Sequence, residues 1–258
     1  MERRDFIQKT ILTGAAVAGA GLGAAQAKTA AKDNEVYELR VYHMRRNMGP
    51  LDNYLSKALI PALNRKGVKN VGVFSELSKS EPAQIYMLVP FKSFEDYGRI
   101  TVELKSDKDF MEASSDYTKI PLDQAVFERY DSSLLLAFDG HPKMSVPGKS
   151  RKLFELRTYE GYSEDAVARK VKMFNSGEID IFREVKLNAV FYSQNIAGKD
   201  LPCLTYMAAY DSMEERESVW KAFSAHPEWQ KISKLPEYAN TVSKIHKTFL
   251  EPVSYSQV

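Results

Sequence analysis

The chain has 258 residues, of which 44% are apolar and 27% are charged, and its net charge at pH 7 is only +2. This composition is typical of a globular protein with a hydrophobic core and excludes an intrinsically disordered chain. A net charge so close to zero gives no general attraction to nucleic acid or acidic lipid, so we expect no nucleic-acid partner.

The first 27 residues have the order of an export signal. The stretch RRDFIQK at residues 3–9 resembles the twin-arginine motif of bacteria, an Ala/Gly-rich apolar run follows at residues 11–25, and Ala25-Gln26-Ala27 is a small-residue cleavage site. The run is shorter than the roughly 20 apolar residues of a membrane span. We therefore expect residues 1–27 to be a cleaved signal peptide, with no stable membrane span afterwards and a periplasmic or otherwise exported mature chain.

A short phrase occurs twice in the chain, as VYELRVYHM from Val36 and as LFELRTYEG from Leu153. The two copies are offset by 117 residues, and later matches drift only to 120. Solenoid repeats are about 20 to 50 residues long, so a repeat of this length indicates a duplicated domain.

Each copy predicts the same order of elements. In the first copy, residues 36–44 alternate as a strand does, residues 51–63 have helical spacing, 71–77 and 83–91 are strands, 93–117 is helical and 127–138 is a last strand. The second copy predicts a strand from 153, a helix opened by Ser163, strands near 189 and 204, a helix from 212 and a strand at 244–250. The order β-α-β-β-α-β is that of the ferredoxin-like unit.

The first helices of the two copies weaken at the same place. Ile60-Pro61 lies there in the first copy and Gly177-Glu178 in the second, which predicts a shared kink. We place the copies at residues 36–138 and 152–258, with a short linker at 28–35 and a Pro/Gly-rich linker at 139–151.

Several of these segments together resemble the NIPSNAP family, present twice. The resemblance rests on YELRVY and FELRTY, on the helix that ends near Gly67, on the strand VGVFSEL and on the helix WKAFSAHPEWQKI. It covers most of residues 36–252. The second copy fits better through Trp220, Phe223, Pro227 and Trp229, whereas the first has DKDF where HPEW would stand. The resemblance implies the dimeric α/β-barrel superfamily, in which two ferredoxin-like sheets face each other, and it leaves the reaction open.

A four-stranded sheet with helices on one face leaves its other face uncovered, and two such sheets can cover each other. The predicted fold class is therefore α+β, with two tandem ferredoxin-like (βαββαβ) units that form an intramolecular pseudo-dimeric α/β barrel. We expect Tyr37, Leu39 and Val41 to pack under the helices. The alternate side chains would then point into the barrel: Glu38, Arg40, Tyr42, Glu155, Arg157 and Tyr159.

Two interpretations of these six residues remain open. As a ligand site, the arginines would hold an anionic or carbonyl group and the tyrosines would orient it. As a structural layer, the Arg, Glu and Tyr side chains would pair with one another and fix how the two halves dock.

No catalytic motif accompanies this set. The four histidines, His43, His141, His226 and His246, have no metal-binding spacing, and Cys203 lies in an apolar strand where a buried thiol is expected. We predict no metal and no resident cofactor, with haem held by a histidine as the alternative.

The predicted function is an exported protein that binds a small organic ligand in the interior or a cleft of its barrel. The alternative is an oxidoreductase of the dimeric α/β-barrel kind, either a monooxygenase or a haem-degrading protein. Whether the protein is an enzyme, and whether it forms a homo-oligomer, the sequence leaves open.

Overall fold

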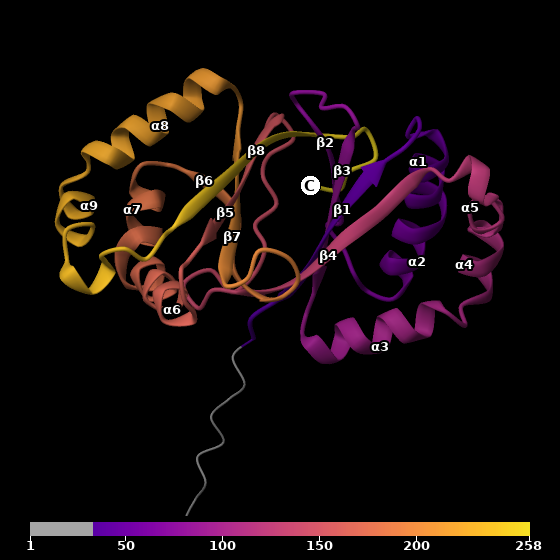
Figure 1. The fold of residues 1–258 in the computed structure, drawn as a ribbon, viewed down its shortest axis with the longest axis horizontal. Helices are drawn as coiled ribbons and strands as arrows, with labels where there is room; N and C mark the ends of the chain where they lie inside the picture. The colour runs from indigo at the N-terminus through magenta and orange to yellow at the C-terminus, as the bar shows by residue number, and fades with distance from the viewer. Residues whose placement is uncertain (1–32) are drawn as a thin grey trace, which may run out of the picture. The chain divides into compact units, whose positions relative to one another are not determined.

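The computed structural model describes residues 33–258 (Figure 1). The expected export signal at residues 1–27 lies outside the described residues. Among the helices of residues 33–258, none combines the length and the apolar character that crossing a membrane requires.

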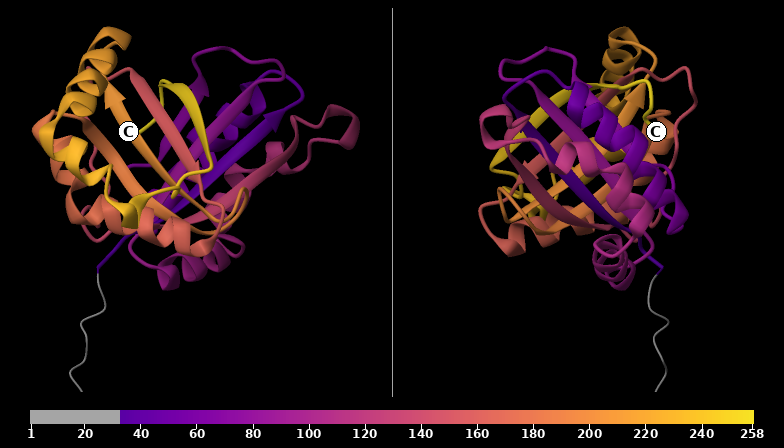
Figure 2. Two further views of the ribbon diagram at one scale, coloured as in Figure 1. Left: turned by 60° about the vertical axis from the view of Figure 1, so that its left-hand side comes forward. Right: turned by 90° about the vertical axis from the view of Figure 1, so that its right-hand side faces the viewer.

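The strands of the described residues form one closed barrel, in which every neighbouring pair is antiparallel (Figure 2). Their order around the barrel is β1-β3-β2-β8-β5-β7-β6-β4. Pairing of β2 with β8 and of β4 with β6 joins the first half of the chain (residues 36–138) to the second (residues 152–258). The bounds are β1 Val36–Met44, β2 Gly72–Glu76, β3 Gln84–Phe91, β4 Phe127–Ala137, β5 Leu153–Glu160, β6 Asn188–Ala197, β7 Cys203–Tyr210 and β8 Lys244–Pro252. The predicted mixture of helices and strands around a closed barrel is confirmed.

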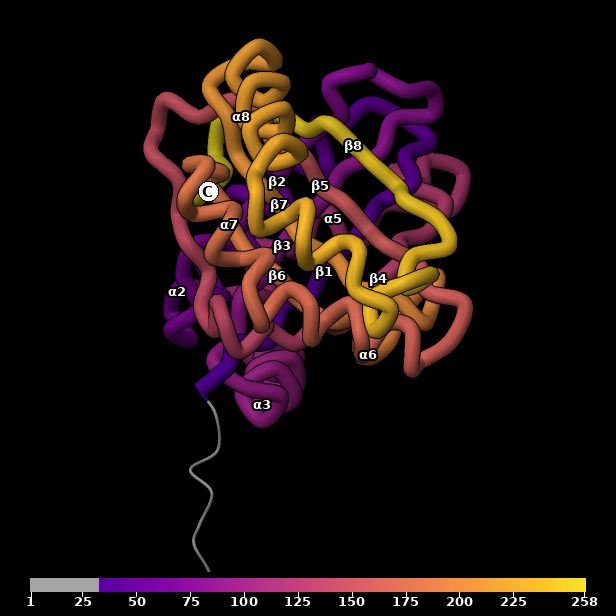
Figure 3. Tube along the Cα trace, turned by 90° about the vertical axis from the view of Figure 1, so that its left-hand side faces the viewer, coloured from indigo at the N-terminus to yellow at the C-terminus, as the bar shows by residue number. Residues whose placement is uncertain are grey.

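The helices lie outside the barrel, α1 to α5 beside the strands of the first half and α6 to α9 beside those of the second (Figure 1). Figure 3 shows the second helix layer in front of β5 and β7. The α-helices are α1 Gly49–Tyr54, α2 Ile60–Arg65, α3 Phe94–Leu104, α4 Lys108–Ala113, α5 Ser115–Thr118, α6 Glu164–Met173, α7 Ile179–Glu184, α8 Met213–Ala225 and α9 Pro227–Ile232. The other helical segments are η1 Leu55–Leu59, η2 Leu122–Gln124, η3 Phe174–Glu178 and η4 Pro236–Tyr238.

Both first helices contain a π-helical turn, η1 between α1 and α2 and η3 between α6 and α7. These turns lie at or next to the two predicted weak points, so a shared irregularity is present. The single helix expected at 93–117 is instead three short helices. Asp107 adopts an extended conformation and its side chain accepts the backbone N–H of Phe110, so it caps a new helix and ends the continuous one.

The apolar core has three parts. One fills the barrel and draws on strands of both halves, including Tyr37, Leu39, Phe74, Phe154, Leu156 and Phe191. The other two lie between the outer face of the strands and the helices of each half. Tyr42 belongs to the outer part of the first half and Tyr159 to that of the second.

The predicted orientation of the first strands was therefore wrong. Tyr37 and Leu39 face the barrel interior, and Glu38, Arg40 and Tyr42 face the helices. The same reversal holds for Glu155, Arg157 and Tyr159, since Phe154 and Leu156 lie in the interior. A barrel of about this size has room only for packed side chains, so its interior selects the larger apolar face.

Candidate functional site

Each half of the protein presents one Glu-Arg-Tyr triad to its helix layer. The first triad is Glu38, Arg40 and Tyr42 on β1, and the second is Glu155, Arg157 and Tyr159 on β5. Three strands separate β1 from β5 in either direction around the barrel. The structure therefore forms two separate sites and does not bring the six predicted residues together in one.

The second triad is fully paired. Glu155 is completely buried and accepts from Arg157 Nη1 at 2.6 Å, from Arg216 Nε and Nη2 at 3.0 and 2.9 Å, and from Trp220 Nε1 at 3.1 Å. Burial alone would raise the pKa of Glu155, but the hydrogen bonds from Arg216 and the charge of Arg157 bring it below its usual value. This carboxylate stays ionised inside the protein because its partners compensate its charge.

Arg157 is also covered. The Trp220 ring of α8 lies 4.3 Å from its guanidinium carbon, and Nε and Nη2 donate to the Tyr159 hydroxyl at 3.2 and 3.0 Å. Tyr159 in turn lies 2.8 Å from the Tyr206 hydroxyl. Only 9% of the Arg157 side chain is exposed, so this triad has the geometry of a structural layer beneath α8.

The first triad is paired but less covered. Arg40 donates from Nε and Nη2 to the two carboxylate oxygens of Glu38 at 2.7 and 2.8 Å, and Ser132 on β4 donates to Glu38 at 2.8 Å. The Arg40 side chain is 20% exposed, and the Tyr130 ring 5.6 Å from its guanidinium carbon belongs to a residue that is 47% exposed. The Arg40 side chain is therefore less covered than that of Arg157.

Tyrosines from several elements surround Arg40. We call this set the tyrosine cluster: Tyr42 on β1, Tyr54 on α1, Tyr97 on α3, Tyr117 on α5 and Tyr130 on β4. The Tyr54 and Tyr117 rings stack with centroids 4.1 Å apart. Burial raises the pKa of Tyr54 to about 12, so its phenol is protonated at neutral pH and can donate a hydrogen bond.

The helices α3 and α8 begin at corresponding places and differ in sequence where α8 covers Arg157. Ser93 and Ser212 are the N-caps of α3 and α8, and each accepts the backbone N–H three residues later. Eight residues after the cap, α8 has Trp220 and α3 has Thr101. Because threonine is too short to cover an arginine as an indole does, Thr101 provides no equivalent of the Trp220 ring.

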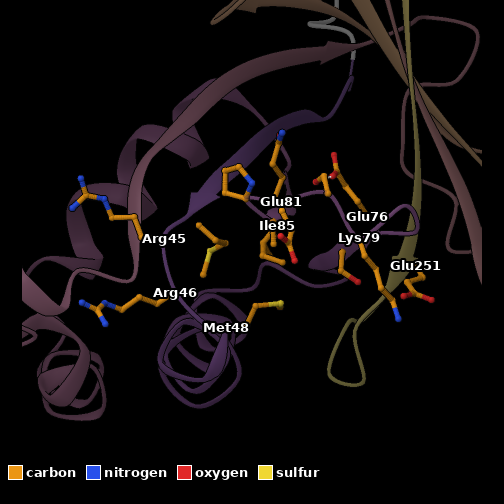
Figure 4. A pocket seen from close by; sticks show the side chains of 14 residues that line it. Arg45, Arg46, Met48, Glu76, Lys79, Glu81, Ile85 and Glu251 are labelled. Carbon is orange, nitrogen blue, oxygen red and sulfur yellow. The ribbon is translucent and has the colours of Figure 1, made fainter.

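Other pockets lie near the first triad. A groove of about 610 Å³ runs between α1 and α5 and is lined by Tyr54 and Tyr117 of the tyrosine cluster. A pocket of about 570 Å³ lies at the end of β1, between the start of α1 and the β2–β3 hairpin (Figure 4). It holds charges of both signs, which are Arg45, Arg46, Lys79, Glu76, Glu81 and Glu251.

Sequence reasoning missed the pocket of Figure 4. Glu251 reaches it only because β8 pairs with β2, and that pairing closes the barrel across the two halves. Tyr86 and Ser80 hold Glu76 in place, Tyr86 through a 2.9 Å hydrogen bond. None of the six predicted residues lines this pocket.

Cys203 is buried, as expected, with 1% of its surface exposed. Burial raises the pKa of its thiol to about 12, so the thiol is protonated at neutral pH and is a poor nucleophile.

Comparison with known proteins supports both the fold and one domain. The model of the NIPSNAP family matches residues 154–257, nearly all of the second half. No curated protein matches the sequence.

Solved structures resemble the whole barrel. A "putative monooxygenase" from Lactobacillus acidophilus NCFM has a TM-score of 0.56 at 10% identity and covers 85% of this chain and 94% of its own. A "putative monooxygenase" from Fusobacterium nucleatum subsp. nucleatum has a TM-score of 0.54 at 7% identity, with coverage of 86% and 93%. An uncharacterized NIPSNAP-like domain protein from Burkholderia xenovorans is 23% identical over 40% of this chain and 87% of its own, with a TM-score of 0.37.

The first two structures share the fold across both halves, so the protein is of the α/β-barrel class. Residues 154–257, which match the model of the NIPSNAP family, lie within that barrel.

Proposed function

We propose that the protein binds a small organic ligand with an anionic or carbonyl group at the first triad, on the outer face of β1. The observation that carries this proposal is the contrast in cover: Arg40 is partly exposed beside Tyr130, whereas Trp220 covers Arg157. The second triad has a structural role, since its polar groups already satisfy one another.

The chemistry of the first triad suits such a ligand. A guanidinium has five N–H donors in a planar fork, and Glu38 accepts from two of its nitrogens. The remaining donors can hold a carboxylate or a carbonyl oxygen. Rings of the tyrosine cluster offer flat apolar walls, and their protonated hydroxyls add donors that orient the ligand.

We also infer that the two halves are tandem copies of one ferredoxin-like unit. The strand order β4-β1-β3-β2 of the first half corresponds to β8-β5-β7-β6 of the second, and π-helical turns and serine caps occur at corresponding places. In this proposal residues 36–138 and 152–258 are related by a pseudo-twofold axis. In the second copy the triad stabilises the fold, and in the first copy it is accessible to a ligand.

A direct test compares two matched variants, Arg40→Met and Arg157→Met. The probe is 4-hydroxybenzoate, an aromatic anion of the expected class, and calorimetry measures its binding while thermal melts measure stability. We expect Arg40→Met to lose binding. It also leaves the buried Glu38 carboxylate with only its hydrogen bond from Ser132, so the melting temperature should fall, and circular dichroism checks that the variant folds. Arg157→Met should bind the probe and melt at a lower temperature. Retained binding in Arg40→Met would contradict the proposed site.

An oxidoreductase of the monooxygenase kind is the second candidate. It rests on the two solved structures that share the fold over both halves, each of which is described as a "putative monooxygenase". Ligand that is retained on purification and identified by mass spectrometry would serve as substrate in an oxygen-uptake assay. Oxygen consumption that disappears in Arg40→Met would favour the enzyme, whereas binding without consumption would favour the binding protein. A spectrum with added haem that shifts, and no longer shifts in one histidine variant, would favour the haem-degrading kind.

Export remains part of the proposal. The signal-like order of residues 1–27 supports a mature chain that begins near Lys28 outside the cytoplasm. Intact-mass measurement of protein from the native cell envelope tests this. A full-length chain that begins at Met1 in the cytosol would contradict it.

A further inference from the structure

One end of the barrel carries two histidine–carboxylate pairs. Strands β1 and β5 are four steps apart in an antiparallel order, so they run in the same direction and end at the same rim. At that rim His43 Nε2 lies 2.8 Å from an Asp131 oxygen, and His246 Nε2 contacts Glu160. Each pair joins the first and last strands of its half.

The two pairs occupy corresponding positions with the residue types exchanged. Asp131 on β4 is the cross-strand partner of Val41, and His246 on β8 is the cross-strand partner of Thr158. The first strand therefore carries the histidine in the first half and the carboxylate in the second. This correspondence supplies an internal control for any property assigned to one pair.

The loop between β6 and β7 places a positive charge beside the first pair and a negative charge beside the second. Its Lys199 places an ammonium group 3.7 Å from Asp131 of the first pair. Its Asp200 adds a carboxylate to the second pair, and one ligand atom from each of Glu160, Asp200 and His246 lies within 4.8 Å of the other two. Within residues 33–258 this is the one group of three His, Cys, Asp or Glu side chains whose ligand atoms are close enough to share a metal ion.

We propose that Glu160, Asp200 and His246 bind a divalent transition-metal ion of the zinc type. Zinc takes imidazole nitrogen and carboxylate oxygen at about 2.0 to 2.2 Å in tetrahedral sites, so its ligand atoms lie about 3.4 Å apart. The ligand atoms lie within 4.8 Å of one another, so side-chain rotations can reach this geometry: Asp200 moves closer, and Glu160 and His246, which contact each other, separate so that both face the ion. Three protein ligands leave a fourth position for water.

The nearby charges favour a bound cation. Lys244 Nζ lies 3.7 Å from Glu160, so it compensates one of the two carboxylates and leaves Asp200 uncompensated at this pair. The site is reachable from solvent, because the side chains of Glu160 and His246 are 24% and 37% exposed and Asp200 is exposed. The thiol of Cys203 points toward the carbonyl of Lys199, at 3.7 Å, and is not needed as a ligand.

The site lies apart from the proposed ligand site. Side chains of the first triad face the helices on the outside of β1, whereas the metal ligands come from β5, β8 and the β6–β7 loop at the rim. In the sequence Asp200 is 40 residues from Glu160 and 46 from His246, so no short spacing motif could reveal the set.

Isothermal titration of the full chain with ZnCl2 tests the proposal. We expect one site per chain in the wild type, and at least a tenfold loss of affinity in His246→Ala, Asp200→Asn and Glu160→Gln. His43→Ala, which alters the corresponding pair, and His226→Ala, which alters the pair with Glu184, should bind zinc as the wild type does. Arg40→Met should also bind zinc normally, which separates this test from that of the proposed function.

Three results would overturn the proposal. They are no zinc binding by the wild type, unchanged affinity in His246→Ala and Asp200→Asn, or an equal loss in His43→Ala or His226→Ala. The last would identify general binding to surface histidines. Because the three ligands are partly or largely exposed, these variants should fold, and circular dichroism of each one checks this.

Discussion

The two halves of the barrel begin with the same Glu-Leu-Arg phrase, and the structure surrounds it differently in each half. In the second half Glu155 and Arg157 lie beneath Trp220, with every strong donor and acceptor satisfied. In the first half Arg40 donates to both carboxylate oxygens of Glu38 and remains partly exposed, and Thr101 is the residue that corresponds in sequence to Trp220. The two triads therefore share their residue types and differ in how far the arginine is covered.

The first helices show a second difference of the same kind. Lys170 and Glu178 form a buried ion pair of 2.7 Å in the second half. Leu51 and Leu59 hold the corresponding places in the first, since Leu59 and Glu178 both end a π-helical turn and each partner lies eight residues earlier. One fold thus accommodates an apolar pair and an ionic pair at the same site.

The largest effect should come from Glu155→Gln. This change leaves Arg157 and Arg216 without their carboxylate, and uncompensated buried charge of this kind costs about 3 to 5 kcal/mol. The matched change Glu38→Gln should cost about 1 to 2 kcal/mol, because Arg40 retains access to water. Denaturant titration of both variants measures the contrast, and equal losses would mean that cover does not distinguish the triads.

The cost of Glu155→Gln should also depend on pH. Because the pKa of Glu155 is lowered in the folded protein, its stabilising contribution is present above its ordinary pKa near 4.5 and is lost as the pH falls through the lowered value. The difference between wild type and variant should therefore shrink on acidification below about pH 4.5. A difference that stays constant down to pH 3 would contradict the assigned pKa direction.

Trp220→Thr should make the second triad resemble the first. Loss of a partly buried indole that packs on Arg157 and donates to Glu155 should cost about 2 to 3 kcal/mol. Arg157 should then become accessible, and the second half should gain weak binding of 4-hydroxybenzoate. Calorimetry on Trp220→Thr combined with Arg40→Met isolates that new site, and absence of binding would show that cover alone is not sufficient.

Replacing the ionic pair by its apolar counterpart should change stability in the other direction. Lys170→Leu with Glu178→Leu copies the first half, and such exchanges are neutral or stabilising by about 1 to 4 kcal/mol. Burial raises the pKa of Glu178, so the wild type loses stability as the pH rises through that raised pKa, and the double variant should not. Thermal melts between pH 4 and 8 compare the two proteins. The single variant Lys170→Leu, which leaves Glu178 unpaired, should be clearly destabilised.

The smallest effect on stability should come from Thr101→Trp. An indole at this position would cover Arg40 as Trp220 covers Arg157, with a change in unfolding free energy of less than about 1 kcal/mol because Thr101 lies at a partly exposed place. Binding of 4-hydroxybenzoate should nevertheless be lost. Thr101→Ala serves as the control and should bind normally; equal binding by all three proteins would mean that residue 101 does not cover Arg40.

The sequence by itself determined the order of the elements, the doubled strand phrase, the irregular first helices and the resemblance of the second half to the NIPSNAP family. These are local properties, because periodicity, caps and kinks depend on residues a few positions apart. The burial of Cys203 could also be predicted, because the residues around it in the sequence form an apolar strand.

Only the tertiary structure decided which face of each strand is inside. The alternation of residues along β1 places Glu38 and Arg40 on one face and Tyr37 and Leu39 on the other. Both faces of β1 are covered, and the alternation does not show which face meets the helices and which meets the barrel interior. The lid over Arg157 comes from a helix about 60 residues away, and Glu160, Asp200 and His246 meet only because eight strands close into a barrel. Such contacts depend on pairings distant in the chain, and these pairings leave no periodic signal in the sequence.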